Sequence, residues 1–195
     1  MSPAYREAVS THLPQAKIVF DRFHVMKLFN EKLSNLRRDL HREATDVMKK
    51  KVLKGTRWLL LKAAENLDEE KDEKKKLKEA LALNQSLATA YYLKEDLRQF
   101  WEQPGKKFAT LFLDGWIKRA EASGIKMLQG MGKTLAAHRS GLLAYYDVMI
   151  TSGPMEGTNN KIKTMKRQAY GFRDKAFLKL KILAIHEARY ELIGQ

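Results

Sequence analysis

The chain has 195 residues, of which 44% are hydrophobic and none is cysteine, so it is long enough to bury a core and cannot use disulfides, thiolate zinc sites or cysteine nucleophiles. Its net charge of +14 favours a polyanionic partner, most simply nucleic acid, although an anionic membrane surface or an acidic protein stays open. No apolar run approaches the roughly 20 residues that span a bilayer, and the first residues lack the apolar core of a secretory signal, so we expect a cytoplasmic protein that does not enter a membrane.

The N-terminal region predicts one short helix and one strand. Ser2 is suited to cap a helix, Pro3 fits its first position, and the helix should end near Pro14. Residues 17–21, "KIVFD", form a brief apolar run that ends in an acid, which is typical of a buried strand. A single strand cannot form a sheet, so either a partner or sequence outside this chain must supply the others.

The rest of the chain predicts helices. From Arg22 onward, Val25, Phe29 and Leu33 share one helical face, which indicates a long helix. The mixed-charge run at 68–79 is typical of a solvated linker and helix start. Further helices are expected over residues 57–67, 75–101, 108–123, 132–149 and 175–193.

Asp21 and His24 place a carboxylate three residues before an imidazole, at the junction between the expected strand and the long helix. The pair has two interpretations. It can form a structural contact that fixes the junction, which the residues alone favour, or it can lie near a metal ion.

The segment 152–174, "SGPMEGTNNKIKTMKRQAYGFRD", predicts a turn into a helix with one acid, Glu156, in its first turn. At helical spacing Glu156, Asn160, Lys163 and Arg167 share one side. A carboxylate followed by cations suits a site that holds a divalent metal ion beside a phosphodiester backbone.

A plainer interpretation is a helix whose N-terminus favours an acid and whose remaining face is basic and solvated. That interpretation accounts for Glu156 but not for the excess of cations, because the sequence from position 156 to position 181 contains eight Lys or Arg residues and only two acids. Tyr170 and Phe172 flank Gly171 in a turn, where they can stack on bases or pack, and packing is the better expectation for Phe172.

Five stretches then carry a resemblance that covers nearly the whole chain. The segments "IVFDRFHVMKLFNEKL", "RWLLLKAAENL", "AYYLKEDLRQFW", "WIKRAEASGI" and "SGPMEGTNNKIKTMKRQAYGFRD" occur in this order. In this respect the chain resembles the C-terminal part of bacterial insertion-sequence transposases of the ISL type, members of the DDE superfamily. The resemblance implies a mainly α chain: the C-terminal fragment of a ribonuclease-H-like (α/β) core with a helical insertion and one remaining core strand.

The same resemblance assigns roles to residues. Glu156 corresponds to the glutamate of the family's Asp-Asp-Glu metal triad, while Asp21 and His24 match its Asp-x-x-His element. Ser152 stands where relatives commonly have Asn. The candidate DNA-binding residues are those of the basic segment itself, independently of the resemblance: Asn160, Lys161, Lys163, Lys166, Arg167 and Arg173.

The resemblance implies metal-assisted phosphoryl transfer in the complete protein, with Mg²⁺ or Mn²⁺ held by three carboxylates. The first aspartate of the triad lies on an early strand that we do not find here, and the second usually stands just before the run that opens this chain. We therefore expect a C-terminal portion that is inactive alone.

Three regions follow from this comparison: a core remnant at 1–40, a helical insertion at 41–140, and the helix with the last acid plus a basic C-terminal helix at 141–195. The expected partners are insertion-sequence ends and target DNA, with a nucleoid-associated location. A homo-oligomer or a complex with a full-length transposase stays open. The alternative function is a basic helical DNA-binding module that acts as a non-catalytic or inhibitory fragment.

Overall fold

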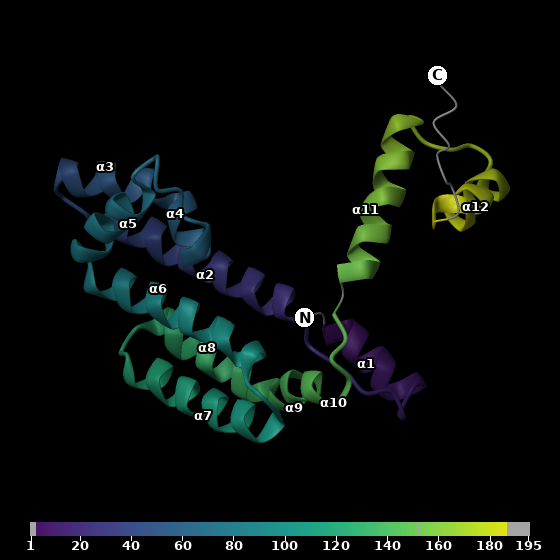
Figure 1. Cartoon of the computed structure of the whole chain (residues 1–195), viewed down its shortest axis with the longest axis horizontal. Coiled ribbons are helices and arrows are strands. Elements are labelled where there is room, and N and C mark those ends of the chain that lie inside the picture. Colours follow the sequence, from purple (N-terminus) through teal and green to yellow (C-terminus); the bar gives the residue numbers. More distant parts are fainter. Residues whose placement is uncertain (1–2, 152, 187–195) are drawn as a thin grey trace. The chain divides into compact units, whose positions relative to one another are not determined.

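The structure is a computed structural model, and it describes residues 3–151 and 153–186. It is mainly helical, and none of these residues forms a strand. The chain divides into two compact units, Met1–Ile150 and Thr151–Gln195, and each is described by itself (Figure 1). None of the described helices combines the length and the apolar character needed to cross a bilayer.

The first unit is an array of helices joined by short turns. Its two longest helices are α2 (Arg22–Glu43) and α7 (Lys106–Ala122). The remaining helices of the unit are α1 (Pro3–His12), α3 (Val47–Gly55), α4 (Arg57–Leu61), η1 (Ala64–Asn66), α5 (Glu73–Ala82), α6 (Gln85–Arg98), η2 (Gln99–Glu102), α8 (Lys126–Ala137), α9 (Arg139–Leu143) and α10 (Tyr145–Val148).

The core of the first unit lies between α2, α6, α7 and α8. As the spacing predicts, Val25, Phe29 and Leu33 of α2 are fully buried. Phe29 meets the ring of Trp116 edge-on, with the ring centroids 6.1 Å apart, and the Trp116 indole N–H donates to the backbone oxygen of Leu93 at 2.9 Å. The buried indole is thus both packed and hydrogen-bonded, as a buried tryptophan requires.

One lysine belongs to this buried region. The Lys94 side chain of α6 is almost completely buried, and its Nζ donates to the backbone oxygens of Leu60 and Lys62, each at 2.8 Å, and lies 2.8 Å from a carboxylate oxygen of Glu95. Burial lowers the pKa of Lys94, while the neighbouring Glu95 carboxylate opposes that shift. Lys94 thereby satisfies carbonyl groups at the end of α4 that the helix cannot satisfy itself.

The prediction of a strand over residues 17–21 is wrong. These residues have no strand partner among the described residues, and a lone extended segment cannot satisfy its backbone groups as a sheet would. The segment is instead held by α9: the Phe20 N–H donates to the Gly141 oxygen at 3.0 Å, and the Phe20 ring stacks on His138 at 4.9 Å. A Cβ on Gly141 would lie 2.5 Å from the Phe20 ring, so this packing depends on glycine.

Several predicted helices are interrupted. The first helix and the long helix from Arg22 are confirmed, but the one expected over 75–101 is split at Asn84, whose side chain accepts the Leu87 N–H at 2.9 Å and caps α6. In the helix expected over 57–67, the α-helix ends at Leu61. The helix expected over 132–149 is divided at His138 and Ala144. Apolar periodicity continues across these breaks, so it did not reveal them.

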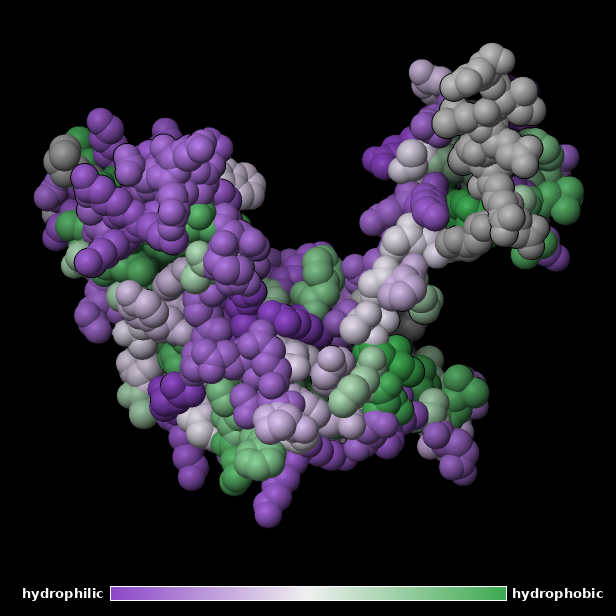
Figure 2. Space-filling view, in the orientation of Figure 1, coloured by the Kyte–Doolittle hydropathy of each residue, from purple (hydrophilic) through white to green (hydrophobic). Residues whose placement is uncertain are grey.

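The second unit contains α11 (Gly153–Gln168), α12 (Lys175–Leu183) and η3 (Ala184–His186). Pro154 lies in the first turn of α11 as predicted, whereas the proposed cap Ser152 and residues 187–193 of the predicted last helix lie outside the described residues. The Asp174 side chain caps α12 by accepting the N–H groups of Ala176 and Phe177. Phe177, Leu180 and Leu183 of α12 are exposed to solvent. Figure 2 shows hydrophobic side chains at the surface in this part of the chain.

Candidate nucleic-acid interface and acidic residues

Glu156 lies in the first turn of α11, where the exposed N–H groups of the helix favour a negative charge. Its side chain is half-buried, unlike those of Met155 and Asn160, which are exposed. Two residues further on, the Thr158 hydroxyl donates to the Pro154 backbone oxygen at 3.0 Å and stabilises the same turn. The carboxylate is therefore carried by a regular, locally hydrogen-bonded helix start.

The basic residues follow along the same helix. Asn160, Lys163 and Arg167 are all exposed, and at positions +4, +7 and +11 from Glu156 they share its side of α11. We call Asn160, Lys163 and Arg167, together with the exposed Lys161 and Lys166, the α11 strip. Because Lys166 and Arg167 lie in the last turn, they also complement the negative end of the helix dipole.

A tight turn ends α11 and presents an aromatic ring. The Gly171 N–H donates to the Lys166 oxygen at 2.9 Å, and Tyr170 and Gly171 adopt φ values of 50° and 100°. Tyr170 is fully exposed, whereas Phe172 is half-buried and its ring centroid lies 6.1 Å from that of Phe177. Phe172 therefore packs, as the sequence suggested, and Tyr170 is left available for stacking.

Arg173 follows Phe172 in the same turn, and its side chain is exposed. The capping residue Asp174 is its immediate neighbour. The position between the two helices keeps the Arg173 guanidinium in solvent, where it adds to the positive charge of this unit.

Asp21 and His24 belong to the first unit. Asp21 is the N-cap of α2: its carboxylate accepts the Phe23 N–H at 3.2 Å, and its backbone adopts an extended conformation. His24 is exposed, and its ring meets that of Phe23 edge-on with the centroids 5.6 Å apart. The junction role of Asp21 is thus visible in the structure, because its carboxylate caps the first turn of α2.

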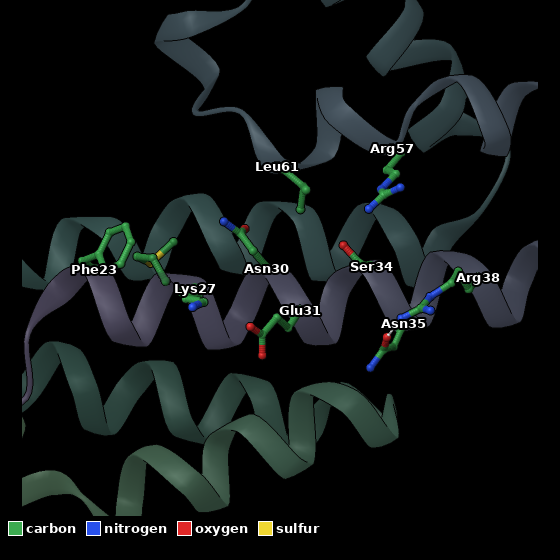
Figure 3. Close-up of a pocket in the computed structure, with 10 residues that line it drawn as sticks. Phe23, Lys27, Asn30, Glu31, Ser34, Asn35, Arg38, Arg57 and Leu61 are labelled. Atoms are coloured by element: carbon green, nitrogen blue, oxygen red, sulfur yellow. Dashed lines mark hydrogen bonds between the residues drawn. The ribbon is translucent and has the colours of Figure 1, made fainter. Parts of the chain in front are cut away.

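The first unit also contains a groove that the sequence did not suggest. It has a volume of ≈ 670 Å³ and runs between α2 and α4, lined by Phe23, Met26, Lys27, Asn30, Glu31, Ser34, Asn35, Arg38, Arg57 and Leu61. Figure 3 shows Asn30 and Ser34 of α2 directed toward Leu61 and Arg57 of α4, while Glu31 and Asn35 point away from α4. A signal existed in the sequence: positions 27, 30, 34 and 38 form a polar face of the long helix opposite Val25 and Phe29.

Comparison with known proteins gives the family. A family model described as "Transposase", that of the DDE transposases of the ISL3 type, matches residues 1–182. The chain belongs to this transposase family.

Among its relatives, the transposase for insertion sequence element IS1001 from Bordetella parapertussis is 36% identical over 186 residues, which are 94% of this chain and 45% of that protein. The transposase for insertion sequence element IS1557 from Mycobacterium tuberculosis is 33% identical over 144 residues, 73% of this chain and 32% of that protein. The chain thus spans less than half the length of these curated relatives. No solved structure matches it.

Proposed function

We propose that this chain forms the C-terminal part of a DDE transposase and acts in DNA transposition, where it supplies the last acid of the metal site and a surface for the DNA backbone. The observation that carries the proposal is the start of α11, where the acid that matches the family's glutamate heads a helix whose exposed face is basic. The ends of an insertion sequence and its target DNA would be the substrates.

Glu156 fits the role of a metal ligand in its chemistry. Its carboxylate is an oxygen donor, which Mg²⁺ and Mn²⁺ prefer, and its half-buried position in the first helical turn restricts the side chain without removing it from solvent. When bound, such an ion would activate the attacking hydroxyl and stabilise the leaving oxygen of the phosphodiester. One carboxylate holds Mg²⁺ weakly, so Glu156 alone would not make a strong site.

The α11 strip would hold the DNA backbone by charge. Exposed Lys and Arg side chains release counterions from DNA when they contact phosphates, which gives affinity without sequence preference. Asn160 would add a neutral hydrogen-bond donor, and Arg173 would extend the contact beyond the end of α11. Tyr170, which is fully exposed, is placed to stack on an unpaired base.

Asp21 and His24 have a smaller part in the proposal. Asp21 already caps α2, so its removal would loosen the start of that helix whether or not it also binds a metal ion. We retain both as candidate catalytic residues of the complete protein. We also retain the division into a core remnant at 1–40, an insertion at 41–140 and a segment at 141–195 that carries the last acid.

The second candidate function is a non-catalytic DNA-binding module. The net charge of +14 and the basic α11 strip support binding by itself, without the acids that catalysis needs. Such a chain would occupy element ends or join a full-length transposase in an inactive complex. The two functions differ in one observable. Only the catalytic function predicts metal-dependent DNA cleavage or strand transfer that disappears in Glu156→Ala.

The DNA surface is tested by a salt titration. Replacing Lys163, Lys166 and Arg167 by Ala should make the negative slope of log K against log salt shallower by about 2.7, because each phosphate contact contributes roughly −0.9 to it. Fluorescence anisotropy with a labelled duplex measures the slope. Replacing three exposed lysines of α12, Lys175, Lys179 and Lys181, by Ala gives a control with the same change in charge and should reduce the magnitude of the slope less.

The role of Glu156 is read from the same titration with and without Mg²⁺. Without the ion, Glu156→Gln should tighten DNA binding slightly, because it removes a negative charge beside the phosphates. With Mg²⁺ the substitution should reduce the gain in affinity that the ion provides. An unchanged slope in the triple variant would show that the α11 strip is only a solvated face.

A further inference from the structure

The groove between α2 and α4 lies on the face of α2 opposite its core face. Val25, Phe29 and Leu33 are fully buried on one side, while Lys27, Glu31 and Arg38 are exposed on the other. The lining residues of α2 run from position 23 to position 38, which corresponds to about 22 Å of helix at 1.5 Å per residue. The groove is therefore elongated along a regular element.

Positive charge is concentrated at the end of this groove. Arg38 and Arg57 line it from α2 and α4, and Arg37 lies beside them, with its Nη1 donating to the Leu53 backbone oxygen at 3.0 Å. Burial lowers the pKa of Arg37, and the charges of Arg57 and Arg38 lower it further. Three guanidinium groups therefore repel one another here, and the Arg37 Nε is buried with no hydrogen-bond partner in the described structure. An anion would relieve this repulsion.

An exposed aromatic residue stands next to the groove. The Arg57 guanidinium carbon lies 4.7 Å from the centroid of the Trp58 ring, a cation–π contact that restrains the arginine. The Trp58 side chain is 65% exposed. An arginine pre-positioned on an exposed aromatic ring loses less conformational entropy when it contacts a phosphate.

The small polar residues complete the pattern. Asn30, Ser34 and Asn35 line the groove between Lys27 and Arg38 of α2, while Phe23 and Met26 line it near the start of that helix. Glu31 is the single acid in the lining. The lining thus offers three cations, hydrogen-bonding amides and a hydroxyl, which is the mixture that contacts DNA phosphates and sugars.

We infer that this α2–α4 groove binds the phosphodiester backbone of DNA as a second contact surface, separate from the α11 strip, with Lys27, Arg38 and Arg57 on the phosphates. The inference rests on the proposed function, because it takes DNA as the partner. The groove's length of about 22 Å corresponds to roughly six base-pair rises at 3.4 Å per step. An acidic protein segment would be the other occupant that this charge admits.

Trp58 provides a direct test inside the first unit. The chain has three tryptophans, and the other two are 8% and 0% exposed, so quenching of fluorescence by acrylamide reports almost entirely on Trp58. Binding of a 20-bp duplex should shield Trp58 and reduce the quenching constant severalfold. Trp58→Phe should remove the signal, which assigns it.

Substitutions then test the cations and the acid. Replacing Lys27, Arg38 and Arg57 by Ala should make the negative salt slope of DNA binding shallower by about 2.7, whereas replacing Lys75, Lys76 and Lys78 of α5 by Ala should change it much less. The double variant Arg38→Lys with Arg57→Lys keeps both positive charges and should retain most of the salt slope of DNA binding. A loss of slope in the Ala variant is then due to the lost charge and not to a change in folding. Glu31→Gln should tighten binding. Thermal melts followed by circular dichroism verify that each variant is folded.

The outcomes separate this inference from the proposed function. If DNA binds through the α11 strip but Trp58 stays fully quenchable and the groove variant keeps the wild-type slope, the groove inference is wrong and the proposed function stands. If the groove variant loses slope while the α11 strip variant does not, the groove inference stands and the strip is wrong. Absence of any DNA binding overturns both.

A competition experiment distinguishes the two occupants. Poly-glutamate, added at the same charge concentration as the duplex phosphates, should leave Trp58 shielded by DNA. Displacement of the duplex by poly-glutamate would overturn the assignment to DNA and indicate an acidic protein partner.

Discussion

The two units of this chain differ in how much of themselves they bury. The first unit has a continuous core in which Phe29, Leu113, Trp116 and Leu135 are fully buried. In the second unit none of the described residues is buried, although α11 and α12 are both amphipathic. Amphipathic sequence therefore does not by itself produce a core, because a helix needs neighbours that cover its apolar face.

The difference bears on where the proposed chemistry lies. Glu156 and the α11 strip belong to the second unit, in which none of the described residues is buried. The proposed groove belongs to the unit with a core. We expect the groove to be pre-formed and the second unit to depend on binding partners for its order.

The largest expected effect concerns core substitutions. Trp116→Ala should lower the free energy of unfolding by about 3–5 kcal/mol, because the indole is fully buried and hydrogen-bonded. Leu180→Ala on α12 should change it by less than about 0.5 kcal/mol, since that side chain is 64% exposed. Urea denaturation followed by circular dichroism measures both. Similar losses in the two variants would contradict the contrast between the units.

A smaller effect is expected at glycines. Gly141→Ala should destabilise the first unit by about 1–3 kcal/mol, because the new methyl group would overlap the Phe20 ring. Gly157→Ala in α11 has no atom within 4 Å of the new Cβ and should stabilise its helix by roughly 0.5–1 kcal/mol. Thermal denaturation compares the two. A neutral Gly141→Ala would mean that the 17–21 segment is not held against α9.

The smallest effect concerns pH and again falls in the first unit. Hydrogen bonds from Lys17 and then Lys106 lower the pKa of Asp147 below its usual value, which ties the 17–21 segment to α7 and α10. A carboxyl with a lowered folded pKa stabilises the fold above its unfolded pKa, near 3.8, and this contribution is lost as the pH falls through the lower folded value. Asp147→Asn should therefore be less stable at pH 6 and lose less stability on acidification.

Urea midpoints measured between pH 6 and pH 2.5 check this prediction. Lys17→Gln is the matched variant, because it removes the first partner of Asp147 and leaves the second. Its effect should not add fully to that of Asp147→Asn. Identical acid profiles for the wild type and both variants would contradict the proposed pairing.

The sequence predicted the helical class and the main core face. Val25, Phe29 and Leu33 recur at helical spacing, and they are buried. The periodic pattern failed where polar capping ends one helix and starts another, as at Asn84, because a cap changes a single residue and leaves the apolar period intact. It also failed at residues 17–21, since a short apolar run has the same composition whether it pairs with a strand or packs on a helix.

The candidate site shows the same limit. The α11 strip was predictable because acids and bases on one helix follow a fixed spacing. The groove was not predicted, because Arg57 of α4 joins Lys27 and Arg38 only through tertiary packing across 19 or more positions in the sequence. The division between the two compact units at position 150 lies beside the Ser-Gly-Pro turn signal at 152–154, but that signal predicts only a turn and does not mark where one compact unit ends.

The buried Lys94 gives the first unit a distinct chemical reactivity. Amine reagents such as acetylating or methylating agents need an accessible, unbonded amine, but the Lys94 side chain is almost completely buried and its ammonium is occupied by Leu60, Lys62 and Glu95. Most other lysines in the described chain have exposed ammonium groups that react in the folded state. Labelling of Lys94 would therefore occur only when the fold opens. The rate at which mass spectrometry detects the label at this side chain would then report how often the first unit opens.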